Sequence, residues 1–468
     1  MPERTFDVIV IGAGPTGENA ADYAVRAGMS AALVESERFG GECSFWACIP
    51  SKALLRTGHA VAAARRLPGV TAEFDPAAVL ARRDAFTHDW DDSSQAEWAR
   101  AAEITAIRGH GRLAGPKAVQ VDGPDGGLLR ARHAVVVASG SVPVRPPIPG
   151  LDTVRYWGSR EATSAKEVPR RLGVLGGGVV GSEMAQAFAR LGSHVVLLNR
   201  GPRLLPSAEP MAGERVAAAF RADGIDLRLE QGLDEVFAGP DGSVLLRVGA
   251  ETIEVDELLV ATGRRPNTTD IGLSSVGLEP GMPLPADDSG LVAGVEGEWL
   301  YAAGDVTGRA PVTHQGKYAA RIVGAAIAAR SIGEPLDTAT WGEHAATADH
   351  AAVPQVVFTD PEVAFVGCTE HRALDEGIRV RAIELELTVA GAFLQADNYA
   401  GAARMVVDAD REVLVGATFV GQDVAEMLHA ATIAVVGEVP LARLWHAVPA
   451  FPTMSEIWLR LLETYRSS

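Results

Sequence analysis

The chain has 468 residues, a formal net charge of −18 and an apolar fraction of 47%. This length allows about three domains, and the apolar fraction excludes an intrinsically disordered chain. The acidic balance argues against a nucleic-acid partner or an anionic membrane surface. We expect a cytoplasmic protein without membrane insertion, because no signal peptide precedes the first strand pattern and no apolar run approaches about 18 residues.

The first recognisable unit is a strand, a glycine-rich turn, a helix and a second strand. Residues 6–11 form an apolar run typical of a buried parallel strand, and a helical pattern covers residues 18–27. The second strand, residues 31–34, ends in Glu35, whose carboxylate is placed to bind an adenosine ribose. Between strand and helix, the glycines provide a tight turn, close approach to a pyrophosphate and helix–strand packing; they are, in that order, Gly12, Gly14 and Gly17.

Two of the three cysteines lie in the next stretch, Gly40–Lys52. Cys43 and Cys48 are separated by four residues, which is compatible with a redox pair, half a metal site or two packed cysteines. A disulfide needs Cα atoms within about 7 Å, whereas a continuous helix would place these two roughly 8.6 Å apart. If they bond, the chain between them must leave helical geometry, and Gly41 and Pro50 permit this.

The strand–glycine–helix–strand unit recurs later in the chain. Residues 171–175 and 194–198 are its strands, and residues 182–191 its helix. The glycines of its turn correspond in order to those of the first unit and are Gly176, Gly178 and Gly181.

The second unit lacks the ribose carboxylate. Glu35 follows Gly17 by eighteen residues, and the residue eighteen positions after Gly181 is Asn199. Arg200 and Arg203 come directly afterwards, and arginine attracts the 2′-phosphate that a carboxylate would repel. This favours NADPH here and FAD in the first unit, although Arg200 is also compatible with an ordinary surface arginine.

Three further strand ends place small or acidic residues where a cofactor could approach, at Ser139-Gly140, Gly263 and Asp305. Taken singly, each is also compatible with a simple turn or a helix cap. Residues 143–150 form a proline-rich extended crossover between domains. From about residue 353, strand and helix patterns alternate without a glycine fingerprint, which indicates an α+β domain.

Over nearly its whole length, the sequence resembles the class I pyridine nucleotide-disulfide oxidoreductases, or flavin disulfide reductases. The matched blocks occur in the family's order and begin at Gly12, Gly40, Ala138, Gly176, Ala261, Ala303 and Phe358. The block from Gly40 through Cys43 and Cys48 to Lys52 is the most specific single match.

The resemblance implies an α/β fold with two Rossmann-like domains and a C-terminal α+β domain that forms a homodimer. The FAD-binding domain would comprise residues 1–150 and 275–345, the NAD(P)H-binding domain 151–274, and the dimerisation domain 346–468.

The resemblance also implies roles for individual residues. Cys43 and Cys48 would form the redox disulfide, with Cys48 against the flavin and Cys43 facing the substrate. Lys52 and Glu183 match the ion pair near the flavin's reactive nitrogen, and Asp305 matches the residue that holds the ribityl chain. The remaining cofactor contacts would come from Gly41, Ser139, Gly140 and Gly263. No metal site is expected.

The closing motif departs from the family pattern. Relatives place a histidine base two residues before a threonine and pair it with a glutamate; here the positions hold Phe451 and Glu456. Phenylalanine cannot carry a proton, which favours an acceptor such as a quinone or an activated disulfide. The alternatives are a dihydrolipoamide dehydrogenase that uses His446 as its base, and a catalytically quiet flavin-binding dimer. A C-terminal cysteine pair, which mercuric reductases carry, is missing.

Overall fold

The computed structural model describes residues 3–467, which form two compact units. Unit 1 contains the described residues up to Ile49, Thr87–Val144 and Arg264–His350. Unit 2 contains Pro50–Phe86, Arg145–Gly263 and the described residues from Ala351 onwards. The chain passes from unit 1 to unit 2 between Val144 and Arg145, inside the segment expected to be an interdomain crossover.

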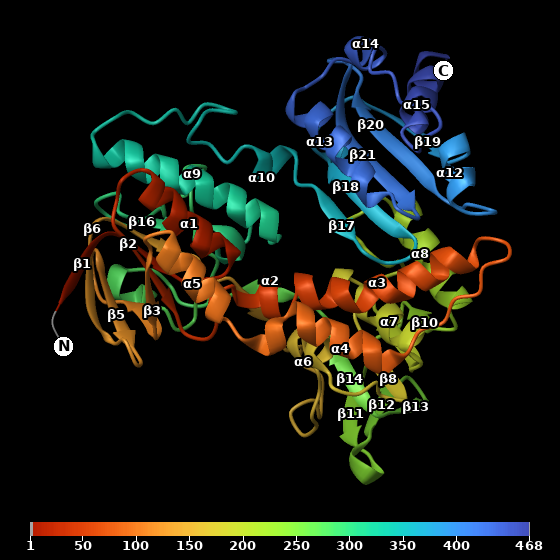
Figure 1. The fold of residues 1–468 in the computed structure, drawn as a ribbon, viewed down its shortest axis with the longest axis horizontal. Helices are drawn as coiled ribbons and strands as arrows, with labels where there is room; N and C mark the ends of the chain where they lie inside the picture. Colours follow the sequence, from red (N-terminus) through yellow and green to blue (C-terminus); the bar gives the residue numbers. More distant parts are fainter. Residues whose placement is uncertain (1–2, 468) are drawn as a thin grey trace. The chain divides into compact units, whose positions relative to one another are not determined.

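Unit 1 is built on one large sheet with the order β3-β2-β1-β6-β5-β4, in which β16 also pairs with β6 (Figure 1). Strands β1, β2, β3, β6 and β16 pair in parallel, and β4 and β5 are antiparallel. Side chains of β1 alternate between the two faces: Val8 and Val10 enter one core, and Ile9 and Ile11 the other. Both faces are therefore buried, as the apolar run predicts. The strands are β1 (Arg4–Ile11), β2 (Ala31–Glu35), β3 (Thr105–Arg108), β4 (His110–Leu113), β5 (Ala118–Asp122), β6 (Gly127–Val137) and β16 (Leu300–Ala302); β7 (Ser141–Pro143) pairs separately with β15 (Arg264–Pro266).

Helices α1 (Pro15–Arg26) and α9 (Thr313–Ser331) lie side by side in unit 1 (Figure 1). Two glycines of α9 allow this approach. A Cβ atom at Gly316 would lie 2.2 Å from Thr16 Oγ1, and one at Gly324 would lie 2.6 Å from the Cβ of Tyr23. Unit 1 also contains α2 (Gly41–Phe45), η1 (His88–Trp90), α5 (Ser93–Ala101), η3 (Leu273–Val276), η4 (Gly304–Thr307) and α10 (Ala348–Ala351), whose last residue belongs to unit 2.

Unit 2 contains the second parallel sheet, with the order β10-β9-β8-β14, and a three-stranded antiparallel sheet, β11-β12-β13. One face of the parallel sheet packs against helices, and the other against residues of the antiparallel sheet. The strands are β8 (Arg171–Leu175), β9 (His194–Asn199), β10 (Asp226–Leu229), β11 (Glu235–Ala238), β12 (Val244–Val248), β13 (Glu251–Val255) and β14 (Glu257–Val260). The helices are α3 (Cys48–Arg65), which begins in unit 1, α4 (Pro76–Phe86), α6 (Ser159–Ser164), α7 (Val179–Leu191), α8 (Pro210–Ala222) and η2 (Pro240–Gly242).

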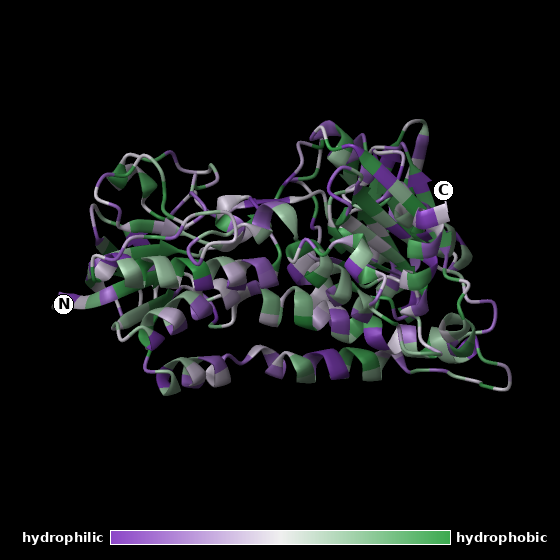
Figure 2. Ribbon diagram, turned by 90° about the horizontal axis from the view of Figure 1, so that it is seen from above, coloured by the Kyte–Doolittle hydropathy of each residue, from purple (hydrophilic) through white to green (hydrophobic). Residues whose placement is uncertain are grey.

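The C-terminal part of unit 2 is a five-stranded antiparallel sheet with the order β17-β18-β21-β20-β19. Figure 2 shows these strands mainly in the hydrophobic colour, because α13 and α15 cover the sheet. This α+β arrangement agrees with the sequence prediction. The strands are β17 (Gln355–Val357), β18 (Glu362–Gly367), β19 (Val380–Glu386), β20 (Ala402–Asp408) and β21 (Val413–Gly421). The helices are α11 (Glu370–Asp375), α12 (Ala390–Gln395), η5 (Ala425–Met427), α13 (Leu428–Val436), α14 (Leu441–Leu444) and α15 (Glu456–Ser467).

The division into units differs from the three domains that the sequence suggests. Residues 264–274, expected in the NAD(P)H-binding domain, group with unit 1. Residues 50–86, expected in the FAD-binding domain, group with unit 2. The NAD(P)H-binding and dimerisation segments also fall into one unit, because Phe365 and Val420 of the C-terminal sheet share a hydrophobic core with α7 and α8.

Candidate functional site

The chain leaves helical geometry between the two cysteines. Helix α2 ends at Phe45, Trp46 has φ −136° and ψ −1°, and α3 begins at Cys48. This break confirms the geometric condition that a bond between Cys43 and Cys48 requires. In the structure no disulfide joins the two cysteines; both are half-buried thiols that hydrogen-bond to each other.

A threonine distant in sequence completes this group. The Oγ1 atom of Thr313, the first residue of α9, lies 3.3 Å from Cys48 Sγ and also hydrogen-bonds to Cys43. The hydrogen bond with Cys48 and burial raise the pKa of the Cys43 thiol, whereas Thr313 and the charge of Lys317 act in the opposite direction. Cys43 therefore holds its proton more tightly than an ordinary cysteine. No local sequence pattern marks Thr313, because it lies 265 positions from Cys48.

The two aromatic residues between the cysteines, Phe45 and Trp46, differ in burial. Phe45 is 1% exposed and belongs to the interior, and its carbonyl accepts a hydrogen bond from Trp90 Nε1. Trp46 remains half-buried, and the Arg38 guanidinium lies over both aromatic rings. Phe45 is thus part of the interior, whereas Trp46 is partly accessible.

The backbone of the first glycine turn, Gly12–Gly17, forms a cradle that has no room for a side chain at Gly12 or Gly17. A Cβ atom at Gly12 would lie 2.5 Å from the Ala138 carbonyl oxygen, and one at Gly17 would lie 1.8 Å from the Gly12 oxygen. Gly14, by contrast, is open and immediately precedes α1 without a side-chain cap. Gly41 faces it, since a Cβ at Gly41 would lie 2.6 Å from Gly14 Cα. This arrangement fits a pyrophosphate at the helix N-terminus.

Glu35 supports the same turn from the end of β2. Its carboxylate accepts hydrogen bonds from the backbone nitrogens of Ala13 at 2.8 Å and Glu37 at 2.7 Å. Burial raises the pKa of Glu35, although both backbone donors favour its charged form. The carboxylate is therefore fixed at the strand end, where a ribose hydroxyl could reach it.

The second glycine turn repeats this geometry in unit 2. Cβ atoms at Gly176 and Gly181 would lie 2.5 Å from the Ala261 oxygen and 1.9 Å from the Gly176 oxygen, while Gly178, before α7, is open. Asn199 Oδ1 accepts a hydrogen bond from the Gly177 nitrogen at 3.0 Å. The amide group of Asn199 donates to the carbonyl oxygens of Gly201 and Arg203, both at 3.0 Å. The side chain that replaces the acid thus holds the loop carrying the arginines.

The two arginines of this loop differ in their contacts. Arg203 donates a hydrogen bond to the Pro206 oxygen at 3.0 Å. Arg200 is exposed, its stem passes Gly232, and its guanidinium forms no ion pair or hydrogen bond with a described residue. Arg200 is therefore available to an anionic ligand.

In unit 1, the turn at Ser139-Gly140 is hydrogen-bonded to Asn267. Ser139 Oγ donates to the Asn267 oxygen at 2.7 Å, and the Asn267 nitrogen donates to the Gly140 oxygen at 2.9 Å. Gly140 and Gly263 have φ angles of +72° and +133° and have no atom within 4 Å of a built Cβ. Both turns therefore leave open space at backbone that favours glycine.

Asp305 belongs to a hydrogen-bonded chain that reaches the residue before Cys43. Ser141 Oγ donates to Asp305 Oδ2 at 2.6 Å and accepts from Arg264 Nε at 2.8 Å. Arg264 in turn forms an ion pair with Glu42 at 3.2 Å. The Asp305 side chain does not cap the helix around it, and one carboxylate oxygen has no partner among the described residues.

Lys52 and Glu183 form the ion pair that the family resemblance implies. Lys52 Nζ lies 2.7 Å and 3.0 Å from the two carboxylate oxygens, and the Glu183 side chain is only 2% exposed. The same carboxylate accepts the backbone nitrogen of Phe358 at 2.9 Å, and Lys52 lies 5.0 Å from the centre of the Phe358 ring. These contacts fix the ammonium group on α3, one turn beyond Cys48.

Phe451 lies in an exposed segment of unit 2. Its side chain is 76% exposed, and the neighbouring Val448 is 87% exposed. Glu456 hydrogen-bonds Arg460 through Oε1, but Oε2 is buried and has no hydrogen-bond partner among the described residues. His446 is exposed and is not hydrogen-bonded to Glu456. Within the described chain, the dyad glutamate therefore has no histidine partner.

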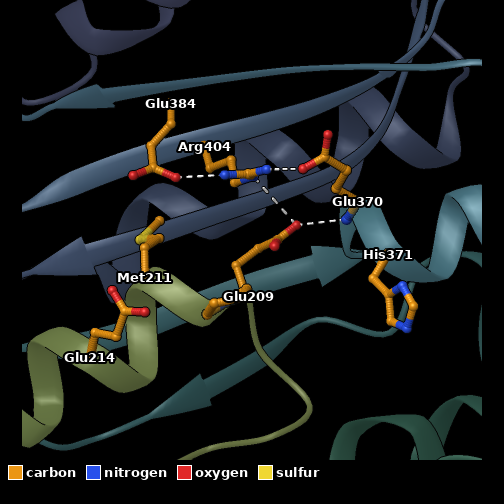
Figure 3. Close-up of a pocket in the computed structure, with 8 residues that line it drawn as sticks. Glu209, Met211, Glu214, Glu370, His371, Glu384 and Arg404 are labelled. Atoms are coloured by element: carbon orange, nitrogen blue, oxygen red, sulfur yellow. Dashed lines mark hydrogen bonds and ion pairs between the residues drawn. The ribbon is translucent and has the colours of Figure 1, made fainter. Parts of the chain in front are cut away.

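A polar cluster in unit 2, which the sequence did not reveal, lines a hollow of about 300 Å³ (Figure 3). Arg404 on β20 lies among Glu209, Glu370 and Glu384, and the Glu209 carboxylate also accepts the Glu370 backbone nitrogen at 2.7 Å. Burial opposes the charged form of Arg404, but these carboxylates raise the pKa of its guanidinium. The cluster joins the start of α8 to the C-terminal sheet and shares no residue with the predicted redox site.

Residues 3–467 contain no group of three or more histidine, cysteine, aspartate or glutamate side chains arranged for a metal ion. None of their helices is both long enough and apolar enough to cross a membrane.

Residues 6–331 match the family described as pyridine nucleotide-disulphide oxidoreductase, and residues 353–461 match its dimerisation domain. The chain belongs to this family. It is 33% identical to a mercuric reductase of Acidithiobacillus ferrooxidans over 465 residues, covering 97% of this chain and 81% of the relative. It is 31% identical to a dihydrolipoyl dehydrogenase of Chlamydia trachomatis serovar D, and the match covers 97% of this chain and 96% of the relative. The Cu(II) complex of the HOCl-induced flavoprotein disulfide reductase RclA from Escherichia coli has a similar fold, with a TM-score of 0.84 and 24% sequence identity. The match covers 98% of this chain and 99% of that chain.

The family assignment makes this protein an FAD-dependent oxidoreductase that acts on a disulfide or a related acceptor and uses a pyridine nucleotide. The C-terminal dimerisation domain supports a homodimer. The two glycine cradles fit these cofactors, because Gly14 and Gly178 are open where a Cβ would block a pyrophosphate.

Proposed function

We propose that the protein passes electrons from NADPH, through FAD and the Cys43–Cys48 pair, to a quinone or an activated disulfide. The observation that carries this proposal is the hydrogen-bonded pair of half-buried thiols in unit 1, the unit that also contains the Gly12–Gly17 cradle and Glu35. A redox pair needs thiols that can both bond to each other and share one proton, and these sulfurs interact directly.

Each group of residues has one task in this reaction. FAD, held by the first cradle and Glu35, would carry the electron pair between the nicotinamide and the thiols. Gly178 and the α7 N-terminus would bind the NADPH pyrophosphate, and Arg200 the 2′-phosphate. Lys52, fixed by Glu183, supplies a positive charge on the helix that Cys48 begins. Cys48 would be the thiolate that contacts the flavin, and Cys43 the thiol that meets the acceptor.

The acceptor class follows from the closing motif. In the family pattern a histidine there moves the proton of substrate thiols, and Phe451 cannot do this. Losing a positioned base lowers the rate by roughly 10²–10⁴-fold where the substrate needs proton transfer. Quinones and activated disulfides depend less on such a base, because the acceptor or its leaving group tolerates the negative charge. We also propose a cytoplasmic location, where thiols are kept reduced.

Stopped-flow reduction of the purified holoenzyme tests the proposal. NADPH should reduce the flavin and produce a long-wavelength thiolate–flavin absorption band, and a quinone or an activated disulfide should reverse both changes. Cys48→Ser should retain the flavin and lose the band, whereas Cys43→Ser should retain a thiolate at Cys48. Failure of both NADPH and NADH to reduce the flavin would leave only a binding role.

A further inference from the structure

We propose that Thr313 is a positioning residue of the redox pair: its hydroxyl donates a hydrogen bond to Cys48 Sγ that stabilises the thiolate form of Cys48. This inference rests on the proposed redox role of the two cysteines. Its basis is geometric, since Thr313 Oγ1 lies 3.3 Å from Cys48 Sγ. The hydroxyl is thus within hydrogen-bond reach of one of the two sulfurs whose bond must open and close.

The position of this hydroxyl is fixed by packing. Thr313 begins α9, and the next turn is anchored against α1, because a Cβ at Gly316 would lie 2.2 Å from Thr16 Oγ1. A Cβ at Gly304, the first residue of η4, would lie 2.8 Å from the same atom. The nitrogen of Gly316 donates to the Val312 oxygen at 3.0 Å, which holds the first turn of α9 closed. Thr313 therefore presents its side chain from a rigid helix end rather than from a loop.

The surroundings of Thr313 favour an anion on the nearby sulfur. Cys48 is the first residue of the 18-residue helix α3, and Thr313 is the first residue of the 19-residue helix α9. Both helix N-termini carry partial positive charge. Lys317 lies one turn further along α9, and its charge favours the anionic forms of Cys43 and of Glu18 on α1. Lys317 therefore favours negative charge on the pair as a whole.

Reduction of the disulfide leaves one proton and one negative charge on the two sulfurs. When the Cys43–Cys48 disulfide takes up two electrons, which a bound flavin would supply, the S–S bond breaks. The Cys43 sulfur takes up one proton and becomes a thiol, and the Cys48 sulfur keeps the negative charge. Thr313 donates to Cys48 without losing its proton, because a hydroxyl is a far weaker acid than a thiol. Thr313 therefore stabilises the charge on Cys48 through a hydrogen bond and takes no part in the proton transfer.

Thr313→Val tests this role, because it removes the hydroxyl and keeps the shape. In the reduced holoenzyme, we expect the pH midpoint for iodoacetamide alkylation of Cys48, followed by peptide mass spectrometry, to rise by about one unit. The alkylation rate at neutral pH should fall about ten-fold, as expected for loss of a hydrogen bond to a charged group. The thiolate–flavin band should weaken in parallel. Thr313→Ser, which restores a hydroxyl, should return both readouts to near the wild-type values.

An unchanged Cys48 midpoint in a folded Thr313→Val protein would overturn the proposal. If the valine variant does not fold, Thr313→Ala, which needs no additional room, carries the same expectation. The alkylation readout also separates this inference from the proposed function. Wild-type protein that shows no thiolate–flavin band would contradict the redox scheme, whereas a normal band with no effect of Thr313→Val contradicts only the role of Thr313.

Discussion

The side chain of Asn199 accepts a hydrogen bond from the backbone nitrogen of Gly177 at 3.0 Å. The Glu35 carboxylate accepts the equivalent bond from Ala13 in the other glycine turn. The side chain that accepts this hydrogen bond therefore differs in charge between the two turns: it is a carboxylate in one and a neutral amide in the other. A neutral side chain at this point removes the repulsion that a 2′-phosphate would meet.

Arg200→Glu should shift coenzyme preference from NADPH towards NADH. A charge-assisted hydrogen bond contributes about 1.5–3 kcal/mol, so kcat/KM for NADPH should fall by at least about ten-fold while that for NADH changes little. Steady-state kinetics with both coenzymes and calorimetric binding of 2′,5′-ADP measure this effect. Arg221→Glu, an exposed position on α8, is a control with the same change in charge. An unaltered ratio of the two kcat/KM values would exclude Arg200 from phosphate binding.

Lys52→Met should destabilise the protein, because it leaves the buried Glu183 carboxylate without its cation. Lys52 is one-third exposed, so we expect a loss of about 2–3 kcal/mol in the free energy of unfolding of unit 2. Urea denaturation measures this change. The double variant Lys52→Met/Glu183→Gln should lose less than the sum of the two single variants, since glutamine still accepts the Phe358 nitrogen. Strict additivity would show that the pair contributes no coupling.

Glu18→Gln should change how stability depends on pH. Burial raises the pKa of Glu18 from 4.5 to about 7, opposed by the charge of Lys317 and assisted by that of Glu35. Between these pH values the unfolded chain releases the proton and the folded chain retains it, so the wild type loses stability as pH rises from 4.5 to 7. The shift corresponds to roughly 3 kcal/mol at pH 8.

We therefore expect Glu18→Gln to be more stable than the wild type at pH 8, and the difference to vanish near pH 4. Urea denaturation across this pH range gives the difference directly. Glu97→Gln, at an exposed position of α5, should follow the wild-type profile. A difference between Glu18→Gln and wild type that stays constant with pH would show that Glu18 does not titrate in this range.

Phe451→His should increase turnover with dithiol or disulfide substrates that need a base. Glu456 Oε2 is buried without a hydrogen-bond partner among the described residues. The glutamate of the expected histidine–glutamate dyad is therefore present and could accept a hydrogen bond from a histidine at position 451. A working base raises the rate of such a step by roughly 10²–10⁴-fold. Assays with lipoamide, glutathione disulfide and quinones should show gains for the first two and little change for quinones.

Val448→His supplies the control for this substitution, since Val448 is equally apolar and 87% exposed in the same segment. It should leave the rates with all three acceptors unchanged. No gain in Phe451→His would mean that the shape of the acceptor site, as well as the missing base, separates this protein from its dithiol-oxidising relatives.

The sequence by itself determined the elements with strong local patterns. The strand–glycine–helix–strand order of both units is confirmed, because a buried strand, a glycine turn and a helix N-terminus each depend on neighbouring residues. A break between Cys43 and Cys48 was expected only if the two cysteines bond, because a continuous helix would hold them too far apart, and the structure has such a break. The family assignment likewise rests on short motifs in a fixed order.

Only the tertiary structure brought together residues that are distant in sequence. Thr313 contacts Cys48, and Arg404 forms ion pairs with Glu209 and Glu370. The packing of helices and strands decides these contacts. The assignment of residues 50–86 to unit 2 depends likewise on which core Leu54 and Leu55 join. Local propensity carries no information about such partners, since burial and hydrogen bonding are settled by the packing of whole elements.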